Sequence, residues 1–174
     1  TDVTAVKVEG LPPDEVHAQL GEHGQAADVT LTLKTDAGTA YRYLQLKHSA
    51  SNPQLGWSWS RLLARRSANN RGSSVLGKLA GLMKAVEFKG GFSIVTNQPL
   101  SESVAADIER LFADRAEQQA ENAELIGRLS KELGLGKQQL LTFLKAWDLK
   151  GFSASSRLSI ESELLQYVST LYDA

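Results

Sequence analysis

The stretch ADVTLTLKTDAGTAYRYLQLKH, residues 27–48, contains two runs in which apolar and polar residues alternate. Alternation with a period of two is typical of a β-strand that buries one of its faces. Between the runs lies TDAGT, residues 35–39, in which Gly38 can adopt the positive φ of a tight turn. The stretch therefore predicts a β-hairpin with strands over residues 27–34 and 40–48.

The turn also predicts how the two strands of the hairpin pair. With residues 37 and 38 as a two-residue turn, Val29 lies opposite Leu46 and Leu31 lies opposite Leu44. These four side chains then share one face of the hairpin, because side chains alternate across a strand. The turn and the hydrophobic pattern agree on this register, and we expect the shared face to pack on the core.

The opposite face of the hairpin carries residues that suit metal and phosphate chemistry. In the same register Asp28 lies beside Lys47 and Thr30 lies beside Gln45, at the open end of the hairpin. Asp28, the side-chain carbonyl of Gln45 and the main-chain carbonyl of Leu46 are oxygen ligands of the kind that Mg²⁺ prefers. Lys47 can hold an attacking water and offset charge on a phosphoryl group, while a metal lowers the pKa of that water. A cross-strand ion pair on a solvated sheet face explains the same residues.

The remainder of the chain predicts an α/β domain. Further strands are expected over residues 5–9 and 92–96, and helices over 59–67, 75–88, 102–116, 120–133 and 156–172, whereas 139–149 fits neither period. This order predicts a mixed β-sheet that contains the central hairpin and is flanked by helices. We expect one domain over residues 1–174, with a core over 1–116 and a helical C-terminal part over 117–174.

Composition limits the classes of protein to consider. The chain has 174 residues, which suits one domain, and it lacks cysteine, which excludes disulfides, thiolate zinc sites and cysteine nucleophiles. The sequence contains neither an apolar run long enough to span a membrane nor a signal-peptide pattern. Because the first residue is threonine and a strand follows almost at once, we expect a piece excised from a longer multidomain protein.

The net charge of −1 hides an uneven distribution. Residues 61–89 carry seven basic side chains and one acidic one, whereas residues 101–132 carry four basic and eight acidic ones. A basic segment of this kind permits contact with a polyanion, although two solvated helices also explain it. The acidic stretch then belongs on a distant face or on a contact with another domain.

The hairpin resembles the core of PD-(D/E)xK nucleases, in the form in which glutamine replaces the second acid of the motif. The segments that carry a narrower resemblance are VEGLPPDE (8–15), ADVTLTLK (27–34), YLQLKHS (43–49), FSIVTN (92–97) and FLKAWDLKGFSASSRLSIESELLQYV (143–168). They are similar to the DNA endonuclease domains of bacterial anti-phage effectors, including CBASS effector nucleases and those joined to STAND-type NTPases. The resemblance spans nearly the whole chain.

This resemblance implies a restriction-endonuclease-like fold and hydrolysis of phosphodiester bonds in double-stranded DNA with Mg²⁺ or Mn²⁺. It implies that Asp28 binds the metal, that Gln45 takes the place of the second acid, and that Lys47 is the catalytic lysine. Glu9 matches a further acidic position near the metal, although a solvated strand end also explains it. Basic residues that follow the hairpin are then candidates for the DNA backbone contact: Arg61, Arg65, Arg66, Arg71 and Lys78.

The resemblance also implies a biological setting. It implies a cytoplasmic effector of an anti-phage defence system, without a membrane partner, joined to a C-terminal sensor or NTPase domain and oligomeric when active. Two alternatives stay open. One is a non-catalytic nucleic-acid-binding or protein-interaction module on a degenerate nuclease core, which glutamine in place of an acid favours. The other is an adaptor whose basic segment meets an acidic partner.

Overall fold

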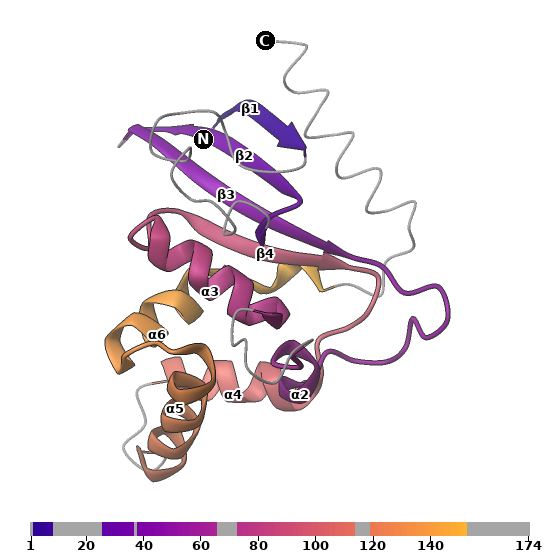
Figure 1. Cartoon of the computed structure of the whole chain (residues 1–174), viewed down its shortest axis with the longest axis vertical. Helices are drawn as coiled ribbons and strands as arrows, with labels where there is room; N and C mark the ends of the chain where they lie inside the picture. The colour runs from indigo at the N-terminus through magenta and orange to yellow at the C-terminus, as the bar shows by residue number, and fades with distance from the viewer. Residues whose placement is uncertain (1, 9–25, 37, 66–72, 114–118, 153–174) are drawn as a thin grey trace.

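The computed structural model of the chain describes residues 2–8, 26–36, 38–65, 73–113 and 119–152 (Figure 1). The strands are β1 (Asp2–Val8), β2 (Val29–Thr35), β3 (Gly38–Lys47), β4 (Gly91–Thr96) and β5 (Trp147–Asp148). The helices are α2 (Trp59–Leu62), α3 (Val75–Ala85), α4 (Glu102–Phe112), α5 (Gln119–Leu133), α6 (Lys137–Lys145) and the 3-10 turn η4 (Leu149–Gly151).

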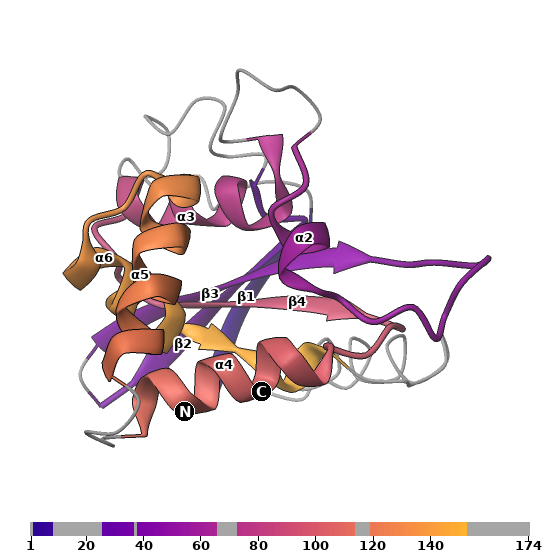
Figure 2. The same ribbon diagram turned by 90° about the horizontal axis from the view of Figure 1, so that it is seen from below.

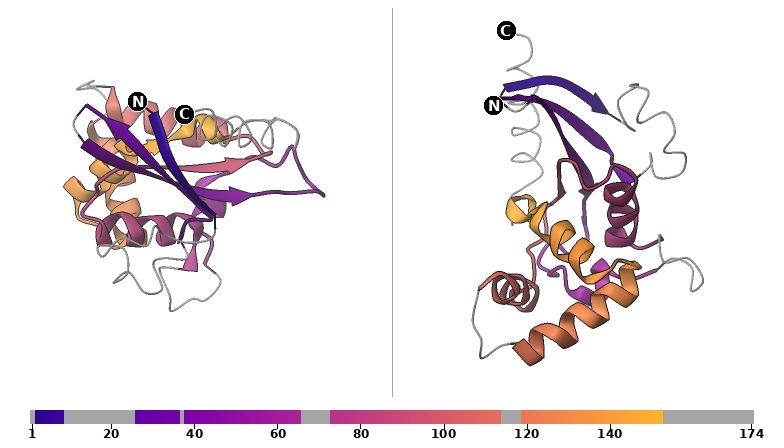
Figure 3. Two further views of the ribbon diagram at one scale, coloured as in Figure 1. Left: turned by 90° about the horizontal axis from the view of Figure 1, so that it is seen from above. Right: turned by 90° about the vertical axis from the view of Figure 1, so that its left-hand side faces the viewer.

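The strands form one mixed sheet in the described part of the chain, in the order β1-β2-β3-β4-β5. β2 runs antiparallel to both of its neighbours, whereas β3, β4 and β5 are parallel. Parallel neighbours need crossover connections, which α2 with α3 and then α4 with α5 and α6 supply. The described helices lie beside β3, β4 and β5, and β1 lies farthest from them (Figures 1 and 3). The predicted mixed sheet flanked by helices is therefore confirmed.

The hairpin is present, but its register differs from the predicted one. Thr35 pairs with Gly38, so residues 36 and 37 connect the strands, and Val29 lies opposite Leu44 rather than Leu46. Gly38 has a φ of 115° and begins β3 instead of completing the turn. The predicted register was wrong by two positions, a shift that leaves every side chain on its predicted face.

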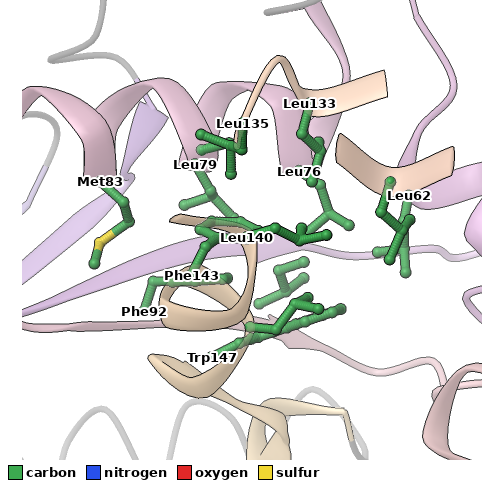
Figure 4. Close-up of a cluster of buried hydrophobic side chains, with 14 of the residues drawn as sticks. Leu62, Leu76, Leu79, Met83, Phe92, Leu133, Leu135, Leu140, Phe143 and Trp147 are labelled. Atoms are coloured by element: carbon green, nitrogen blue, oxygen red, sulfur yellow. The ribbon is translucent and has the colours of Figure 1, made fainter. Parts of the chain in front are cut away.

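The main hydrophobic core lies on the Tyr43 face of the sheet. Phe92 stacks on Phe143 with ring centroids 4.6 Å apart and on Trp147 at 5.8 Å. Leucines of α3 and α6 close over these rings, as Figure 4 shows around Leu79. Stacked rings contribute packing energy beyond the area that they bury, so this cluster adds to the stability of the sheet.

The face that the pattern predicts to pack on the core is also buried, but it belongs to a smaller cluster. Val29, Leu31 and Leu44 form this second group. The opposite face, which the alternative of a cross-strand ion pair requires to be solvated, is buried as well, since Tyr43 and Thr30 on that face are fully buried. Helices cover that face where β3 and β4 run parallel, as is usual for parallel strands.

The C-terminal part of the described chain is integrated into the domain. Phe143 of α6 and Trp147 of β5 belong to the main core, and they fall within the stretch whose period was ambiguous. Arg42 of β3 reaches across β4 to Asp148 of β5, with Nη2 2.7 Å from Oδ2. Its partner position on β4 is Gly91, which has no side chain to block this path. The hydrophobic core therefore includes residues on both sides of position 116.

Two of the predicted helices differ from the structure or lie where it gives no description. α2 ends at Leu62, short of the predicted helix over residues 59–67, and the predicted helix over 156–172 lies outside the described residues. Among the described helices, none is both long enough and apolar enough to cross a membrane.

Candidate functional site

A carboxylate and an amide meet where β2 begins and β3 approaches its end. The Asp28 N–H donates to the main-chain oxygen of Leu44 at 2.8 Å, which extends the hairpin ladder by one residue. The Asp28 side chain then lies opposite Gln45, and Oδ2 accepts a hydrogen bond from the Gln45 amide nitrogen. The same oxygen accepts the main-chain N–H of Leu46 at 2.7 Å. The structure thus brings together two of the three predicted catalytic side chains.

Lys47 lies two residues beyond Gln45 on the same face of β3. Its Cα is paired with that of Thr96 on β4, and its side chain is half-buried. The prediction that Lys47 lies directly opposite Asp28 was wrong, because the register shift places Gln45 there and Lys47 diagonally beyond it. Diagonal neighbours on a sheet face remain within reach of a long side chain.

The hydrogen bond between Gln45 and Asp28 shows what glutamine does at this position. Gln45 is 3% exposed, so a charged group here would need a partner. A glutamine donates to the Asp28 carboxylate, which an ionised acid at position 45 is unable to do. Glutamine therefore stabilises the Asp28 carboxylate without a metal.

The donors that a cation would use are oxygens. Oδ1 of Asp28 and Oε1 of Gln45 are the remaining side-chain oxygens of this pair, and each has the chemistry of a cation ligand. Within the described ranges, no three His, Cys, Asp or Glu side chains gather closely enough to hold a metal. Glu9, the predicted further acid, lies outside these ranges. The oxygen set suits a hard cation that keeps several waters, as Mg²⁺ does.

Buried polar residues lie at the end of β4, next to Lys47, and sequence reasoning missed them. Thr96 is fully buried, and its Oγ1 accepts hydrogen bonds from the Trp57 indole N–H at 3.3 Å and the Gln98 main-chain N–H at 3.2 Å. Gln98 and Asn97 are also buried. The available signal was TNQP, residues 96–99, directly after a buried strand. The carboxyl ends of parallel strands are where α/β sheets usually bind ligands.

Arg61, predicted to contact DNA, makes several contacts within the protein. Its guanidinium donates to the main-chain oxygens of Leu55 at 2.6 Å and Gly56 at 3.0 Å, and to Oε1 of Gln98 at 3.0 Å. It also lies 4.3 Å from the ring centroid of Trp57. These contacts hold the Arg61 guanidinium against residues 55–57 and Gln98.

The other predicted DNA contacts have varied surroundings. Arg65 forms an ion pair with Glu132 of α5, and Lys78 lies half-buried on α3. Arg66 and Arg71 lie outside the described residues. The contact of Arg65, Arg66, Arg71 and Lys78 with DNA stays a prediction.

Comparisons with known proteins give no match to this chain. No protein-family model matches the chain, and no curated protein or solved structure matches it significantly. The hairpin site and the resemblance that the sequence carries are therefore the two observations that bear on function.

Proposed function

We propose that the chain is a metal-dependent endonuclease domain of restriction-endonuclease-like fold that hydrolyses phosphodiester bonds of double-stranded DNA. The observation that carries the proposal is the contact of Asp28 with Gln45 at the open end of the hairpin, with Lys47 two residues further on. The resemblance to PD-(D/E)xK nucleases names these same three residues. The site also lies at the carboxyl end of the parallel pair β3 and β4, an edge that suits ligand binding.

Each residue has a distinct role in this proposal. Asp28, Gln45 and the main-chain carbonyl of Leu46 hold Mg²⁺ or Mn²⁺. Such a cation, when bound, polarises the phosphate and lowers the pKa of a bound water. The Leu46 N–H holds the Asp28 carboxylate in place through its 2.7 Å hydrogen bond. Lys47 orients the attacking water and offsets negative charge on the phosphoryl group.

The biological setting is part of the same proposal. The resemblance covers segments along nearly the whole chain and concerns effector domains of bacterial anti-phage defence. We therefore propose a cytoplasmic effector that works with a C-terminal sensor or NTPase domain and cleaves DNA as an oligomer.

Plasmid cleavage and phage protection test the proposal. We expect the protein with Mg²⁺ to degrade supercoiled plasmid, and Asp28→Ala and Lys47→Ala each to lower the rate by about 100-fold or more. Lys34→Ala is a matched control, because Lys34 lies on the same hairpin and is exposed. The proposal falls if plasmid stays intact with Mg²⁺ and Mn²⁺, and if Lys47→Ala leaves phage protection in cells unchanged.

One observation favours a second candidate, a non-catalytic nucleic-acid-binding module on the same core. Gln45 satisfies Oδ2 of Asp28 without a cation, so the hairpin is stable as a purely structural feature. Isothermal titration that detects no binding of Mg²⁺ or Mn²⁺, together with DNA retardation that survives Asp28→Ala, would support this candidate over the nuclease.

A further inference from the structure

The second hydrophobic cluster of the sheet is buried as deeply as much of the main core. Val29 and Leu31 of β2 are each 2% exposed, and Leu44 of β3 is 5% exposed. Half-buried side chains of the same sheet face pack around them: Leu33, Leu46 and Val95. Neighbours within one sheet shield a side chain from the sides but leave it open above. A further layer must therefore cover this face.

The described helices do not supply that layer. Their buried apolar side chains belong to the main core, from Trp59 of α2 to Leu144 of α6. Among the described residues, the second cluster consists of side chains of β2, β3 and β4. Because these side chains are buried within a single chain, the layer belongs to this chain and lies outside its described ranges.

Two long segments lie outside those ranges, residues 9–25 and 153–174. The first segment leads to Ala26 and Ala27, which belong to the main core on the opposite face of the sheet. The second follows Phe152, whose backbone forms a parallel bridge with Thr96 at the end of β4. Thr96 is next to Val95 of the second cluster, so the C-terminal segment begins beside the face that needs a cover (Figure 2 shows the ends of β3 and β4).

The C-terminal segment has the sequence pattern of an amphipathic helix. Within the predicted helix over residues 156–172, apolar residues recur at spacings of three and four: Ile160, Leu164, Val168 and Leu171. Polar residues lie on the opposite side of such a helix: Ser159, Glu163, Gln166 and Thr170. A helix of this length rises about 25 Å. That exceeds the roughly 14 Å between β4 and β1, so one helix is long enough to cross the face.

We infer that residues 153–174 dock on the second cluster as a helix whose Leu164 and Val168 side faces the sheet. The same strands carry the candidate site on their other face, where Asp28 contacts Gln45. Leu46 belongs to both, since its side chain packs on the second cluster and its N–H holds the Asp28 carboxylate. The docked segment therefore supports the backbone of the candidate site from behind.

A spin label tests whether the segment lies on this face in the full chain. The sequence has no cysteine, so Ser169→Cys provides a unique attachment point next to the predicted apolar side. The nitroxide should broaden the amide signals of Leu31 and Leu44 and leave the signals of α5 sharp, because α5 lies at the end of the molecule away from β1 and β2 (Figure 1). Lys131→Cys, at an exposed position of α5, is the matched control and should give the reverse pattern. Sharp signals of Leu31 and Leu44 with the label at position 169 overturn the inference.

Thiol labelling tests whether the apolar side of the segment is what covers the cluster. Leu31→Cys reports on the second cluster, and Leu79→Cys reports on the main core. Adding Leu164→Ser and Val168→Ser should raise the labelling rate at position 31 about tenfold or more and leave position 79 protected, because apolar contact is lost on one face alone. Gln166→Ser with Thr170→Ser, on the polar side, is the matched control and should change neither rate.

The outcomes also distinguish this inference from others. An unchanged rate at position 31 overturns it. A rate at position 31 that instead rises with Val16→Ser and Leu20→Ser assigns the cover to residues 9–25 and overturns it as well. Neither measurement uses DNA or a divalent cation, so the docking inference can fail while plasmid cleavage supports the nuclease proposal, and the reverse.

Discussion

β4 and the two residues after it, residues 91–98, consist of two halves that are both buried, but by different means. Phe92 and Ile94 in the first half are fully buried among aromatic and aliphatic side chains. Thr96 at the end of the strand, and Asn97 and Gln98 after it, are buried as well, but among hydrogen-bond partners. The halves thus differ in whether burial is non-directional or depends on the placement of donors and acceptors.

This difference indicates which residues contribute most to the stability of the fold and which determine the position of the backbone around them. The free energy gained by burying apolar surface grows with the buried area and changes little when side chains shift slightly. A buried amide, in contrast, is stable only while its hydrogen-bond partners stay in place. The aromatic half of β4 should therefore contribute most to the free energy of unfolding. The polar half should contribute less and instead determine the shape of the loop between β3 and α2, residues 48–58, beside the candidate site.

The largest expected effect is in the aromatic half. Phe92→Ala removes a ring that stacks on Phe143 and Trp147, and we expect it to lower the free energy of unfolding by about 3–5 kcal/mol. Urea denaturation followed by circular dichroism measures this. Phe112→Ala, at an exposed position, should cost no more than about 0.5 kcal/mol. A loss at Phe92 as small as the one at Phe112 would remove the distinction between the two halves.

The next effect concerns the candidate site. Gln45→Glu places a second carboxylate against Asp28 and removes a hydrogen bond, and we expect a loss of about 3 kcal/mol without a divalent cation. If the oxygens bind Mg²⁺, adding it should raise the melting temperature of this variant more than that of the wild type. Gln54→Glu, in the exposed loop, is the control for a mere added charge. A melting temperature of Gln45→Glu that does not change when Mg²⁺ is added would count against a metal at this site.

Asn97→Ala should have a smaller but more local effect. It removes two hydrogen bonds to Ser49, at a cost of about 1–3 kcal/mol. Amide hydrogen exchange should accelerate at Ser49 and Asn52, while the amide of Phe92 keeps its protection under native conditions. Equal acceleration at all three amides would show that Asn97 supports the whole sheet and has no special effect on the loop.

The smallest effect is expected at an ion pair near the surface. Arg65→Gln breaks the pair with Glu132, in which both side chains are partly exposed, and should cost less than about 1 kcal/mol. Arg61→Gln should cost more, because Arg61 donates three hydrogen bonds and lies against Trp57. The two variants can be compared by urea denaturation at low and high salt, where only the cost of Arg65→Gln should shrink with salt. If Arg65→Gln cost more than Arg61→Gln, the ranking of the two interactions would be wrong.

The hairpin could be predicted from the sequence because two runs that alternate with a period of two, joined by a short turn, fit no helix. Its register could not, since a shift of two residues keeps Val29 and Leu44 on the same face in either pairing. Alternation also shows which residues share a face but not which face the helices cover. The burial of Tyr43 and Gln45 on the other face could therefore not be predicted.

The candidate site was predictable in part for a similar reason. Asp28 and Gln45 come together within one hairpin, so local pattern and residue type were enough to predict that they meet. The contacts of Asn97 with Ser49 join residues 48 positions apart and depend on the parallel pairing of β3 with β4. β5 spans two residues, which is too short to produce a period, and its place is decided by β4.

The ion pair between Arg42 and Asp148 has a consequence for how the chain folds. The two residues are 106 positions apart, so their contact closes a very long stretch of chain. Until the ribosome has released residue 148, the outer edge of β4 lacks β5 and its backbone groups can pair with another nascent chain. The sheet is thus completed only after residue 148 has been synthesised, and the open β4 edge is the point at which we expect aggregation to begin when synthesis stalls before that residue.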